Sequence, residues 1–377
     1  MDFEKIIETI TSHKSVNNTK LFLNSYQINY YSTCNDDVNY LQNFLHSSRS
    51  DQSSNFINLY VSQSNKEIKI NILNIIDLEA DKLIRTHLIN SHYYHLYVDD
   101  NDIQVFIYYP IDTCYFILVR GNDYLILFDD DYENKKSLPL YIIREIIYRE
   151  YENSDLLCFH AAACKLVDAG VIIIGPPGSG KTTLLFSLIE HQSGTFISND
   201  RALIGNQPTK IYTLPMPIRL NFATVNNSRA LLNYINENSA TLCRKQSVDD
   251  NQGAVRNKIE LTPLEVSRCF NKDFQDNAPL KLLIIPEFCD INMGEIKIIR
   301  EDIEIAKATL KEECYTPNDP LWIEPWFFRK NINKDDVTKK IENIANNVPI
   351  FKVRYGKDIG AIIEKEAATW FYNMCLK

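Results

Sequence analysis

The chain has 377 residues, of which 45% are hydrophobic and 24% charged, a composition typical of a globular protein with a sizeable core. A formal net charge of −9 disfavours nucleic acid as a partner and gives no general attraction to an anionic membrane. The nine cysteines form no C-x-x-C pair, the first residues lack a signal-peptide pattern, and no stretch is apolar enough to span a membrane. We therefore expect a cytoplasmic protein with no membrane contact.

Residues 1–150 are expected to form a β-rich, mostly antiparallel domain that binds a substrate or partner. Short runs of aromatic and β-branched residues alternate there with polar turns, as in the strands of a pleated sheet. Gly121-Asn122-Asp123 is typical of a tight hairpin turn, and helical spacing is present at 40–44 and 78–89. The predicted strands are 21–23, 56–61, 68–72, 95–98, 104–109, 115–119 and 124–128.

A helix is predicted over 139–147, where Pro139 stands near the first position and apolar residues recur with helical spacing. It leads into a second domain, 151–377, whose pattern of strands alternating with helices favours an α/β fold. In this domain a strand over 158–166 is followed by a second, fully apolar strand over 171–174. Further strands are predicted at 281–285, where Pro286 should end the strand, at 296–299 and at 348–355.

The residues after the apolar strand, Gly175-Pro176-Pro177-Gly178-Ser179-Gly180-Lys181-Thr182, match G-x-x-x-x-G-K-[ST], and a helix is predicted directly after them over 183–189. Glycines let such a loop turn tightly, so successive N–H groups point at one anion, and the helix adds the positive end of its dipole. Lys181 would reach the β- and γ-phosphates, and the Thr182 hydroxyl would ligate Mg²⁺. The predicted nucleotide-binding residues are Gly175, Pro176, Pro177, Gly178, Ser179, Gly180, Lys181, Thr182 and Thr183.

A carboxylate is predicted at the tip of the next strand, 195–198, which ends at Asn199-Asp200. Ligands collect at the carboxyl ends of strands in such sheets, so an acid beside the loop's strand is well placed to bind the metal of a nucleotide. We therefore expect Asp200 to hold Mg²⁺ with Thr182, directly or through water. A turn or capping role before Arg201 is the alternative.

Three features in this order resemble the HPr kinase/phosphorylase family, whose nucleotide fold is shared with phosphoenolpyruvate carboxykinase. They are Phe159-His160-Ala161-Ala162-Ala163, the loop from Gly175 to Thr182, and Phe196-Ile197-Ser198-Asn199-Asp200. The resemblance covers residues 156–205. It implies an α/β fold with an HPr kinase/phosphoenolpyruvate carboxykinase-like P-loop core beside the β-rich (α+β) N-terminal domain. It also implies ATP or GTP as donor, Mg²⁺, and a serine or threonine hydroxyl as acceptor.

The chain departs from the family at the catalytic base. Family members that phosphorylate HPr have two adjacent aspartates at the strand end, one as base and one on the metal side, whereas here the first is Asn199. Asparagine cannot accept a proton at neutral pH. Asp200 could serve both purposes, His160 could take the proton, or dissociative phosphoryl transfer could need no strong base. We rank Asp200 first; a purely structural role for His160 weighs equally with a catalytic one.

Positive charge is also required near the transferred phosphoryl group. Arg219 is the leading candidate because the preceding Pro215-Met216-Pro217 stretch would hold it rigidly, although for each of these cations taken singly a solvated surface charge is the favoured interpretation. The other candidates are Arg201, Arg244, Lys245, Arg256 and Lys258.

Two functions from different classes remain open. The first is a kinase acting on a hydroxyl of a peptide, protein or small molecule, for example in the maturation of peptide natural products. The second is a nucleotide-binding regulator or ATPase, in which the missing first aspartate means that phosphate passes to water or is not transferred. HPr itself is disfavoured as acceptor because the further pattern by which the family grips it is not evident. The sequence also leaves a homo-oligomer open.

Overall fold

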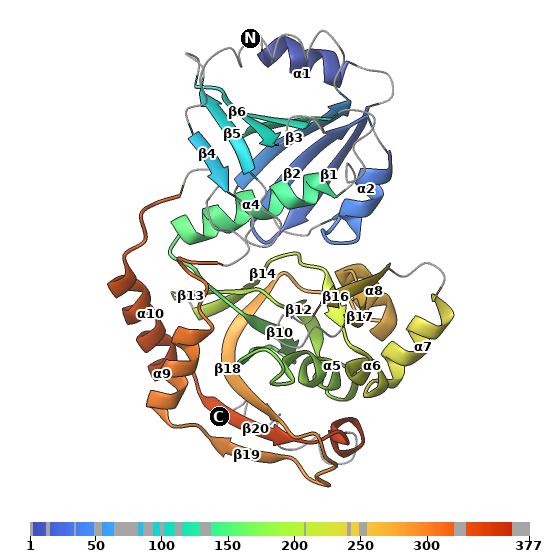
Figure 1. Cartoon of the computed structure of the whole chain (residues 1–377), viewed down its shortest axis with the longest axis vertical. Coiled ribbons are helices and arrows are strands. Elements are labelled where there is room, and N and C mark those ends of the chain that lie inside the picture. The colour runs from blue at the N-terminus through green and yellow to red at the C-terminus, as the bar shows by residue number, and fades with distance from the viewer. Residues whose placement is uncertain are drawn as a thin grey trace. The chain divides into compact units, whose positions relative to one another are not determined.

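The computed structural model describes residues 3–12, 16–33, 35–48, 55–63, 82–85, 93–98, 102–109, 115–128, 137–206, 209–239, 243–248, 255–319 and 329–363. It is a mixed α/β structure that divides into two compact units (Figure 1). The first unit is Met1–Glu150 with Asn318–Arg329, and the second is Tyr151–Pro317 with Lys330–Lys377. Residues 318–329, which we expected in the second domain, are therefore grouped with the first unit. No helix in the described ranges is long and apolar enough to cross a membrane.

The first unit is built on an eight-stranded sheet with the order β1-β2-β3-β8-β7-β6-β5-β4. It is mostly antiparallel, as predicted; β3 pairs in parallel with both β2 and β8. The predicted strands that fall in the described ranges are confirmed, whereas 68–72 lies outside them. The strands are β1 (Asn17–Leu23), β2 (Tyr26–Ser32), β3 (Asn55–Gln63), β4 (Lys82–Arg85), β5 (Tyr93–Val98), β6 (Gln104–Tyr109), β7 (Tyr115–Arg120) and β8 (Asp123–Phe128).

The helix predicted over 78–89 is wrong where the structure describes it. Residues 82–85 form strand β4, which pairs antiparallel with β5 in a register that sets Leu83 opposite His95. Pairing at the sheet edge satisfies the backbone polar groups of this short segment, and such tertiary pairing overrides weak helical spacing. The hairpin turn at Gly121-Asn122 is confirmed, with Gly121 in the left-handed region at φ 58°.

Helices cover both faces of this sheet: α1 (Phe3–Thr11), α2 (Asn35–Gln42) and α4 (Leu138–Asn153). Side chains alternate along β8, so Leu125 and Leu127 share a buried cluster with Phe3 and Ile10 of α1. On the other face Tyr124 lines a cavity with Ile146 of α4. The predicted helices at 139–147 and, in part, 40–44 are confirmed.

The second unit is organised around a sheet with the order β12-β10-β11-β18-β14-β13-β9, to which β20 adds beside β18 and β19 beside β20. A separate three-stranded sheet has the order β15-β17-β16. The strands are β9 (Leu157–Phe159), β10 (Ala161–Leu166), β11 (Ala169–Ile174), β12 (Thr195–Ser198), β13 (Ala202–Asn206), β14 (Thr209–Thr213), β15 (Ile218–Leu220), β16 (Cys243–Val248), β17 (Val255–Leu261), β18 (Asn277–Phe288), β19 (Lys297–Arg300) and β20 (Ile350–Tyr355).

The main sheet is buried on both faces, which explains why β11 has no polar residue. Ile173 points into a cluster with Leu184, on the side of α5 (Lys181–His191). Ile172 and Ile174 point into the opposite cluster, on the side of α9 and α10 (Figure 1). The remaining helices of this unit are α6 (Phe222–Asn226), α7 (Arg229–Glu237), α8 (Pro263–Phe270), α9 (Ile303–Glu312) and α10 (Lys334–Asn347).

Two predicted strand boundaries in this unit are wrong. The strand expected over 158–166 is broken at His160, because β9 pairs with β13 whereas β10 pairs with β11 and β12. Pro286 does not end β18, which continues to Phe288. The pairing of β18 with β11 stops at Ile284. Beyond that residue, β20 is the described strand that pairs with β18, so Pro286, which lacks a backbone N–H, can be tolerated there.

The sheet topology brings three chain segments to one edge. We expected 195–198 directly beside the strand that enters the loop, but β10 lies between β12 and β11. Because β10 is antiparallel to both, β11 and β12 run in the same direction, and β10 begins where they end. Ala161 is opposite Ile174, and Ala163 is opposite Ser198. His160, Gly175 and Asn199 therefore meet at the carboxyl edge of β11 and β12.

Candidate active site

The loop 175–182 joins β11 to α5, as the sequence predicts. Gly178 and Gly180 have φ angles of 83° and 96°, a left-handed conformation that glycine adopts without strain. Gly180 is the N-cap of α5 and supplies no side-chain cap, so the first N–H groups of this helix are available to an anion. The later helices α6 to α10 each have a capping side chain, from Asn221, Ser228, Thr262, Asp302 and Asn333.

Lys181 is folded back over this loop. Its Nζ donates to the carbonyl oxygens of Gly175 at 2.5 Å and Pro176 at 3.1 Å. Burial lowers the pKa of this ammonium group to about 8, and the charges of Glu313 and Asp200 oppose that shift only in part. The loop thus holds a desolvated cation at the uncapped start of α5, an arrangement that favours a polyphosphate.

The lowered pKa predicts that nucleotide binding weakens in mild alkali. Above pH 8 the free protein holds Lys181 mainly uncharged, and a bound phosphate would restore the proton. We expect the affinity for ATP to fall about tenfold between pH 7 and pH 9, with proton uptake on binding. Isothermal titration calorimetry in buffers of different ionisation enthalpy measures both quantities. Lys181→Arg should remove the pH dependence, and an affinity constant from pH 7 to pH 9 in the unmodified protein would contradict the prediction.

The loop is held against β20 by Tyr355, whose buried hydroxyl donates to the Gly180 carbonyl at 2.6 Å. A methyl group at position 180 would overlap this hydroxyl, whereas nothing lies near the corresponding position at Gly178. We expect Gly180→Ala to lower the free energy of unfolding by about 2–4 kcal/mol, from backbone strain plus overpacking, and Gly178→Ala by about 1–2 kcal/mol, from strain only. Urea denaturation distinguishes the two variants. Equal losses would contradict the role of Tyr355.

The first residues of α5 also have polar partners. The Thr182 hydroxyl donates to Asn199 Oδ1 at 3.2 Å, which pairs the expected metal-binding hydroxyl with the end of β12. Thr183 exchanges a hydrogen bond of 2.9 Å with Thr224 of α6. The buried Ser179 hydroxyl has no hydrogen-bond partner within the described ranges. Hydroxyl and amide oxygens therefore cluster beside the start of α5.

Asp200 follows the end of β12 by two residues and has a left-handed backbone conformation, with φ 72°. Its Oδ2 accepts from Arg201 at 2.8 Å, and its Oδ1 lies 3.8 Å from His160 Nε2. The carboxylate is 41% exposed. Asp200 is therefore an accessible carboxylate with one oxygen engaged by a cation and the other facing a histidine.

His160 contacts residues that the sequence patterns did not identify. Its Nδ1 is 2.8 Å from Glu313 Oε2, and its ring stacks on Tyr315 with centroids 5.6 Å apart. Arg201 lies over the same tyrosine ring, 4.2 Å from its centroid. Glu313 follows α9, 153 residues after His160, and lies in no motif; no local signal pointed to it.

Arg219, the leading cation candidate, is not part of this cluster. It lies on β15 in the three-stranded sheet, 58% of its side chain is exposed, and its Nε contacts Glu260 Oε2 at 3.3 Å. Arg201, a second candidate, is buried and contacts both Asp200 and Tyr315. Arg201, unlike Arg219, therefore lies in the cluster that contains Asp200.

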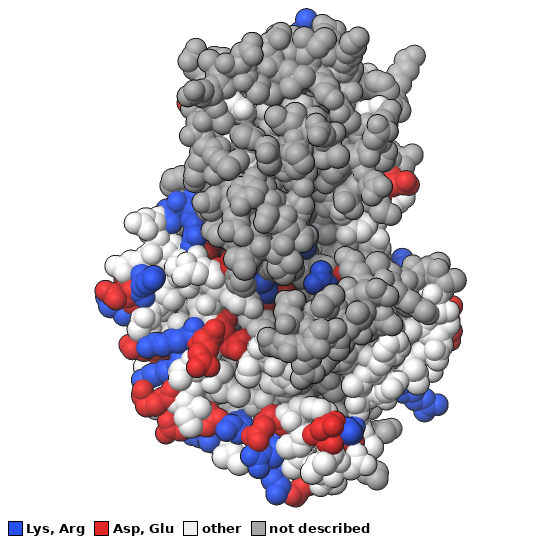
Figure 2. Space-filling view, viewed as in Figure 1, with Lys and Arg blue, Asp and Glu red and all other residues white. Residues whose placement is uncertain are grey.

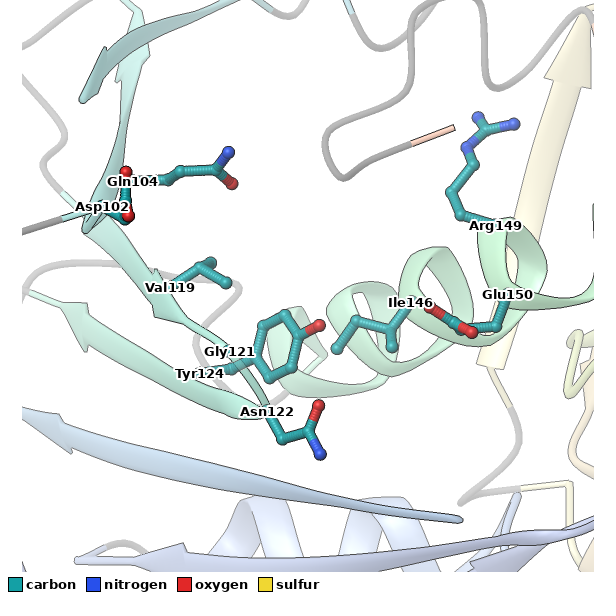
Figure 3. Close-up of a pocket in the computed structure, with 9 residues that line it drawn as sticks. All are labelled: Asp102, Gln104, Val119, Gly121, Asn122, Tyr124, Ile146, Arg149 and Glu150. Atoms are coloured by element: carbon teal, nitrogen blue, oxygen red, sulfur yellow. The ribbon is translucent and has the colours of Figure 1, made fainter. Parts of the chain in front are cut away.

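Described residues of the first unit line two polar hollows. The larger, about 280 Å³, lies between the sheet and α4 (Figure 3), and the smaller is about 210 Å³. Asp102 and Glu150 contribute carboxylates to the larger one, while the guanidinium of Arg149 is bound to Glu145 at 2.7 Å. Carboxylates repel phosphate, so Asp102 and Glu150 in the larger hollow and Glu150 in the smaller disfavour a polyphosphate there. The loop 175–182 remains the better candidate.

No known protein-family model matches the chain, and no curated protein matches it in sequence. Among the described residues no three His, Cys, Asp or Glu side chains converge as metal ligands.

Proposed function

We propose that the second unit is a kinase that binds ATP or GTP with Mg²⁺ and transfers the γ-phosphoryl group to a hydroxyl of a peptide, protein or small molecule. One observation carries this proposal: an uncapped helix start with a buried lysine lies at the same sheet edge as the exposed carboxylate of Asp200. The helix start and Lys181 can bind a polyphosphate, and the Asp200 carboxylate can accept the proton of an acceptor hydroxyl.

The residues present fit a magnesium ion of the kind held mainly by nucleotide and water. Mg²⁺ prefers oxygen ligands and in kinase sites takes few of them from protein, so three converging acids are not required. Thr182 and Asn199, whose oxygens are 3.2 Å apart, are the best-placed pair to hold it. Asp200, expected on the metal side, contacts His160 and Arg201 instead. When bound, the ion would neutralise charge that develops on the transferred phosphoryl group.

We assign the remaining roles from the contacts. Lys181 and the N–H groups at the start of α5 bind the phosphates, and Arg201 neutralises charge beside them. Asp200 Oδ1 accepts the proton of the acceptor hydroxyl; the hydroxyl oxygen bonds to phosphorus as the bond to the leaving nucleoside diphosphate breaks. Asp200 would in this way replace the family's first aspartate, which is Asn199 here. Asp200 is the residue of the pair that faces solvent and His160.

The charge distribution supports a peptide, protein or small molecule as acceptor rather than nucleic acid. Figure 2 shows basic and acidic side chains interspersed on the described surface of the second unit. Four of the ion pairs are Lys297–Glu295, Lys307–Glu304, Lys352–Glu301 and Arg354–Glu287. On the described part of this face, interspersed charges of this kind give no continuous basic track for a phosphate backbone. The HPr kinase-like core and the peptide acceptor remain part of the proposal.

A nucleotide-binding regulator or ATPase is the second candidate, favoured by Asn199 in place of the family's first aspartate. Incubation of the full chain with γ-labelled ATP, Mg²⁺ and serine- or threonine-containing peptides separates the two. Label on a peptide supports the kinase. Release of free phosphate, or nucleotide binding without turnover, supports the second candidate. Absence of any nucleotide binding would contradict both.

A further inference from the structure

The two hollows of the first unit adjoin each other. Four residues line both of them: Asn122, Tyr124, Ile146 and Glu150. From this shared part the larger hollow extends toward the start of β6 and the smaller toward the start of β3. Their volumes, about 280 and 210 Å³, are below the roughly 300–1,000 Å³ of typical small-molecule sites. Each hollow is therefore the size for one amino-acid side chain, and the two together suit neighbouring side chains of a peptide.

The larger hollow combines an apolar floor with oxygen-bearing walls. Tyr124 and Ile146 are buried and form part of the floor. The walls carry carboxylate or amide oxygens from Asp102, Gln104, Asn122 and Glu150. Figure 3 shows the Glu150 carboxylate directed toward Ile146 and Tyr124. Burial raises the pKa of Tyr124, and the charge of Glu150 adds to the shift, which agrees with a carboxylate close to that phenol.

The negative charges of this hollow are not neutralised by described side chains. Arg149 is the cation among the described residues that line it, and its guanidinium is already bound to Glu145 at 2.7 Å. The same guanidinium lies over the ring of Tyr148, 4.8 Å from its centroid. Asp102 and Glu150 form no ion pair within the described ranges. Two carboxylates thus remain available to a cation from outside.

The position of Glu150 on α4 independently indicates a cationic ligand. Glu150 lies in the last turn of the helix, which contains no lysine, arginine or histidine. Unpaired carbonyl groups give a helix C-terminus a partial negative charge, so a carboxylate there is repelled and a cation is attracted. The helix end therefore adds to the negative potential of the hollow, and a bound cation would relieve the repulsion.

The wall formed by the turn between β7 and β8 is fixed before any ligand binds. The Asn58 N–H donates to the Asn122 carbonyl at 2.9 Å, and Asn58 Nδ2 donates to Asp123 Oδ1 at 2.8 Å. Asn58 Oδ1 in turn accepts from Asn29 of β2 at 2.8 Å. This polar ladder ties the turn to two neighbouring strands, so the hollow has the preformed wall expected of a binding site.

We propose that this depression binds the arginine side chain of a peptide, with the guanidinium between Asp102 and Glu150 and the adjacent residue of the peptide in the smaller hollow. A guanidinium has five donors in one plane, pairs with carboxylates in a bidentate manner and stacks on aromatic rings. The aliphatic stem of the arginine would contact Ile146. The proposal concerns the first unit and does not rest on kinase activity of the second.

Peptide binding to the full chain without nucleotide tests the proposal. An array of N-acetylated, C-amidated pentapeptides with a central arginine and varied neighbours identifies the tightest binder, which is then measured by fluorescence polarisation. We expect the same peptide with citrulline in place of arginine to bind about 10- to 100-fold more weakly, because citrulline keeps the shape but not the charge. Lysine at that position should bind several-fold more weakly than arginine.

Conservative variants connect the binding to this hollow. Asp102→Asn and Glu150→Gln should each weaken the arginine peptide about tenfold and leave the citrulline peptide unaffected. Asparagine tolerates the left-handed conformation at position 102, where φ is 57°, so this variant should fold. Glu8→Gln is the matched control, because Glu8 is exposed on α1, which packs on the other face of the sheet.

Four results would overturn the proposal. The first is an array on which no arginine peptide binds, and the second is equal affinity for the arginine and citrulline peptides. The third is an affinity in Asp102→Asn and Glu150→Gln no lower than in Glu8→Gln. The fourth is N-acetylarginine amide binding as tightly as the best peptide, which would exclude a role for the smaller hollow. None of these measurements involves phosphoryl transfer, so failure of the kinase proposal leaves them unaffected.

Discussion

Replacing Lys181 by alanine is expected to weaken ATP binding about 100-fold and to abolish measurable phosphoryl transfer. The ammonium group supplies charge-assisted hydrogen bonds, each worth about 1.5–3 kcal/mol, and it lies in a desolvated loop where water replaces it poorly. Equilibrium binding of a fluorescent ATP analogue, followed by competition with ATP, measures the change.

Two control variants make the Lys181 result specific. Lys181→Met keeps most of the side-chain volume, so an equal loss of affinity in both variants would exclude a collapsed cavity as the cause. Lys165→Ala removes a partly exposed lysine of β10 that pairs with Asp168, and it should leave ATP affinity unchanged. Full nucleotide affinity in Lys181→Ala would contradict the assignment of the loop.

Replacing Asp200 by asparagine is expected to lower kcat by about 10²–10⁴ while ATP affinity stays within a few-fold of the unmodified value. The amide keeps the shape and the contact with Arg201 but cannot accept a proton. Single-turnover transfer of labelled phosphate from ATP to a peptide or small-molecule acceptor measures the chemical step directly.

The same experiment separates the two roles considered for Asp200. If the carboxylate holds Mg²⁺, the variant should need more magnesium for nucleotide binding, and raising magnesium should restore turnover. If the carboxylate is the base, magnesium should restore nothing. Asp168→Asn, which alters a 93% exposed carboxylate in the turn before β11, is the matched control. A rate within threefold of the unmodified protein would contradict both roles.

Short, strongly patterned segments of this chain were predictable because their signals are local. An apolar run followed by Gly175–Thr182 specifies a strand, a tight turn and a helix start from neighbouring residues only. The β-branched and aromatic runs of residues 1–150 likewise predicted most strands of the first sheet. Segment 82–85 shows the limit, because its helical spacing was weaker than the pairing offered by β5.

The site depended on contacts that no local pattern contains. The break between β9 and β10 at His160 exists because the two parts of this apolar run pair with different strands, β9 with β13 and β10 with β11 and β12. The rigid stretch before Arg219 suggested a catalytic cation, yet β15 pairs with β17 and directs that residue to Glu260. Arg201, the cation that contacts Asp200, and Glu313, the acid that contacts His160, depend on where distant strands and helices place their ends.

By itself, then, the amino-acid order determined that this protein has a buried strand leading into a tight glycine-rich turn and a helix start, because glycine conformation and helix polarity act over a few residues. Only the tertiary structure decided that Asp200, His160 and Glu313 form one connected group, because sheet order brings together residues up to 153 positions apart. The order of residues along the chain does not indicate that these three residues are neighbours. Their proximity follows from strand pairing and from the burial of both faces of the sheet.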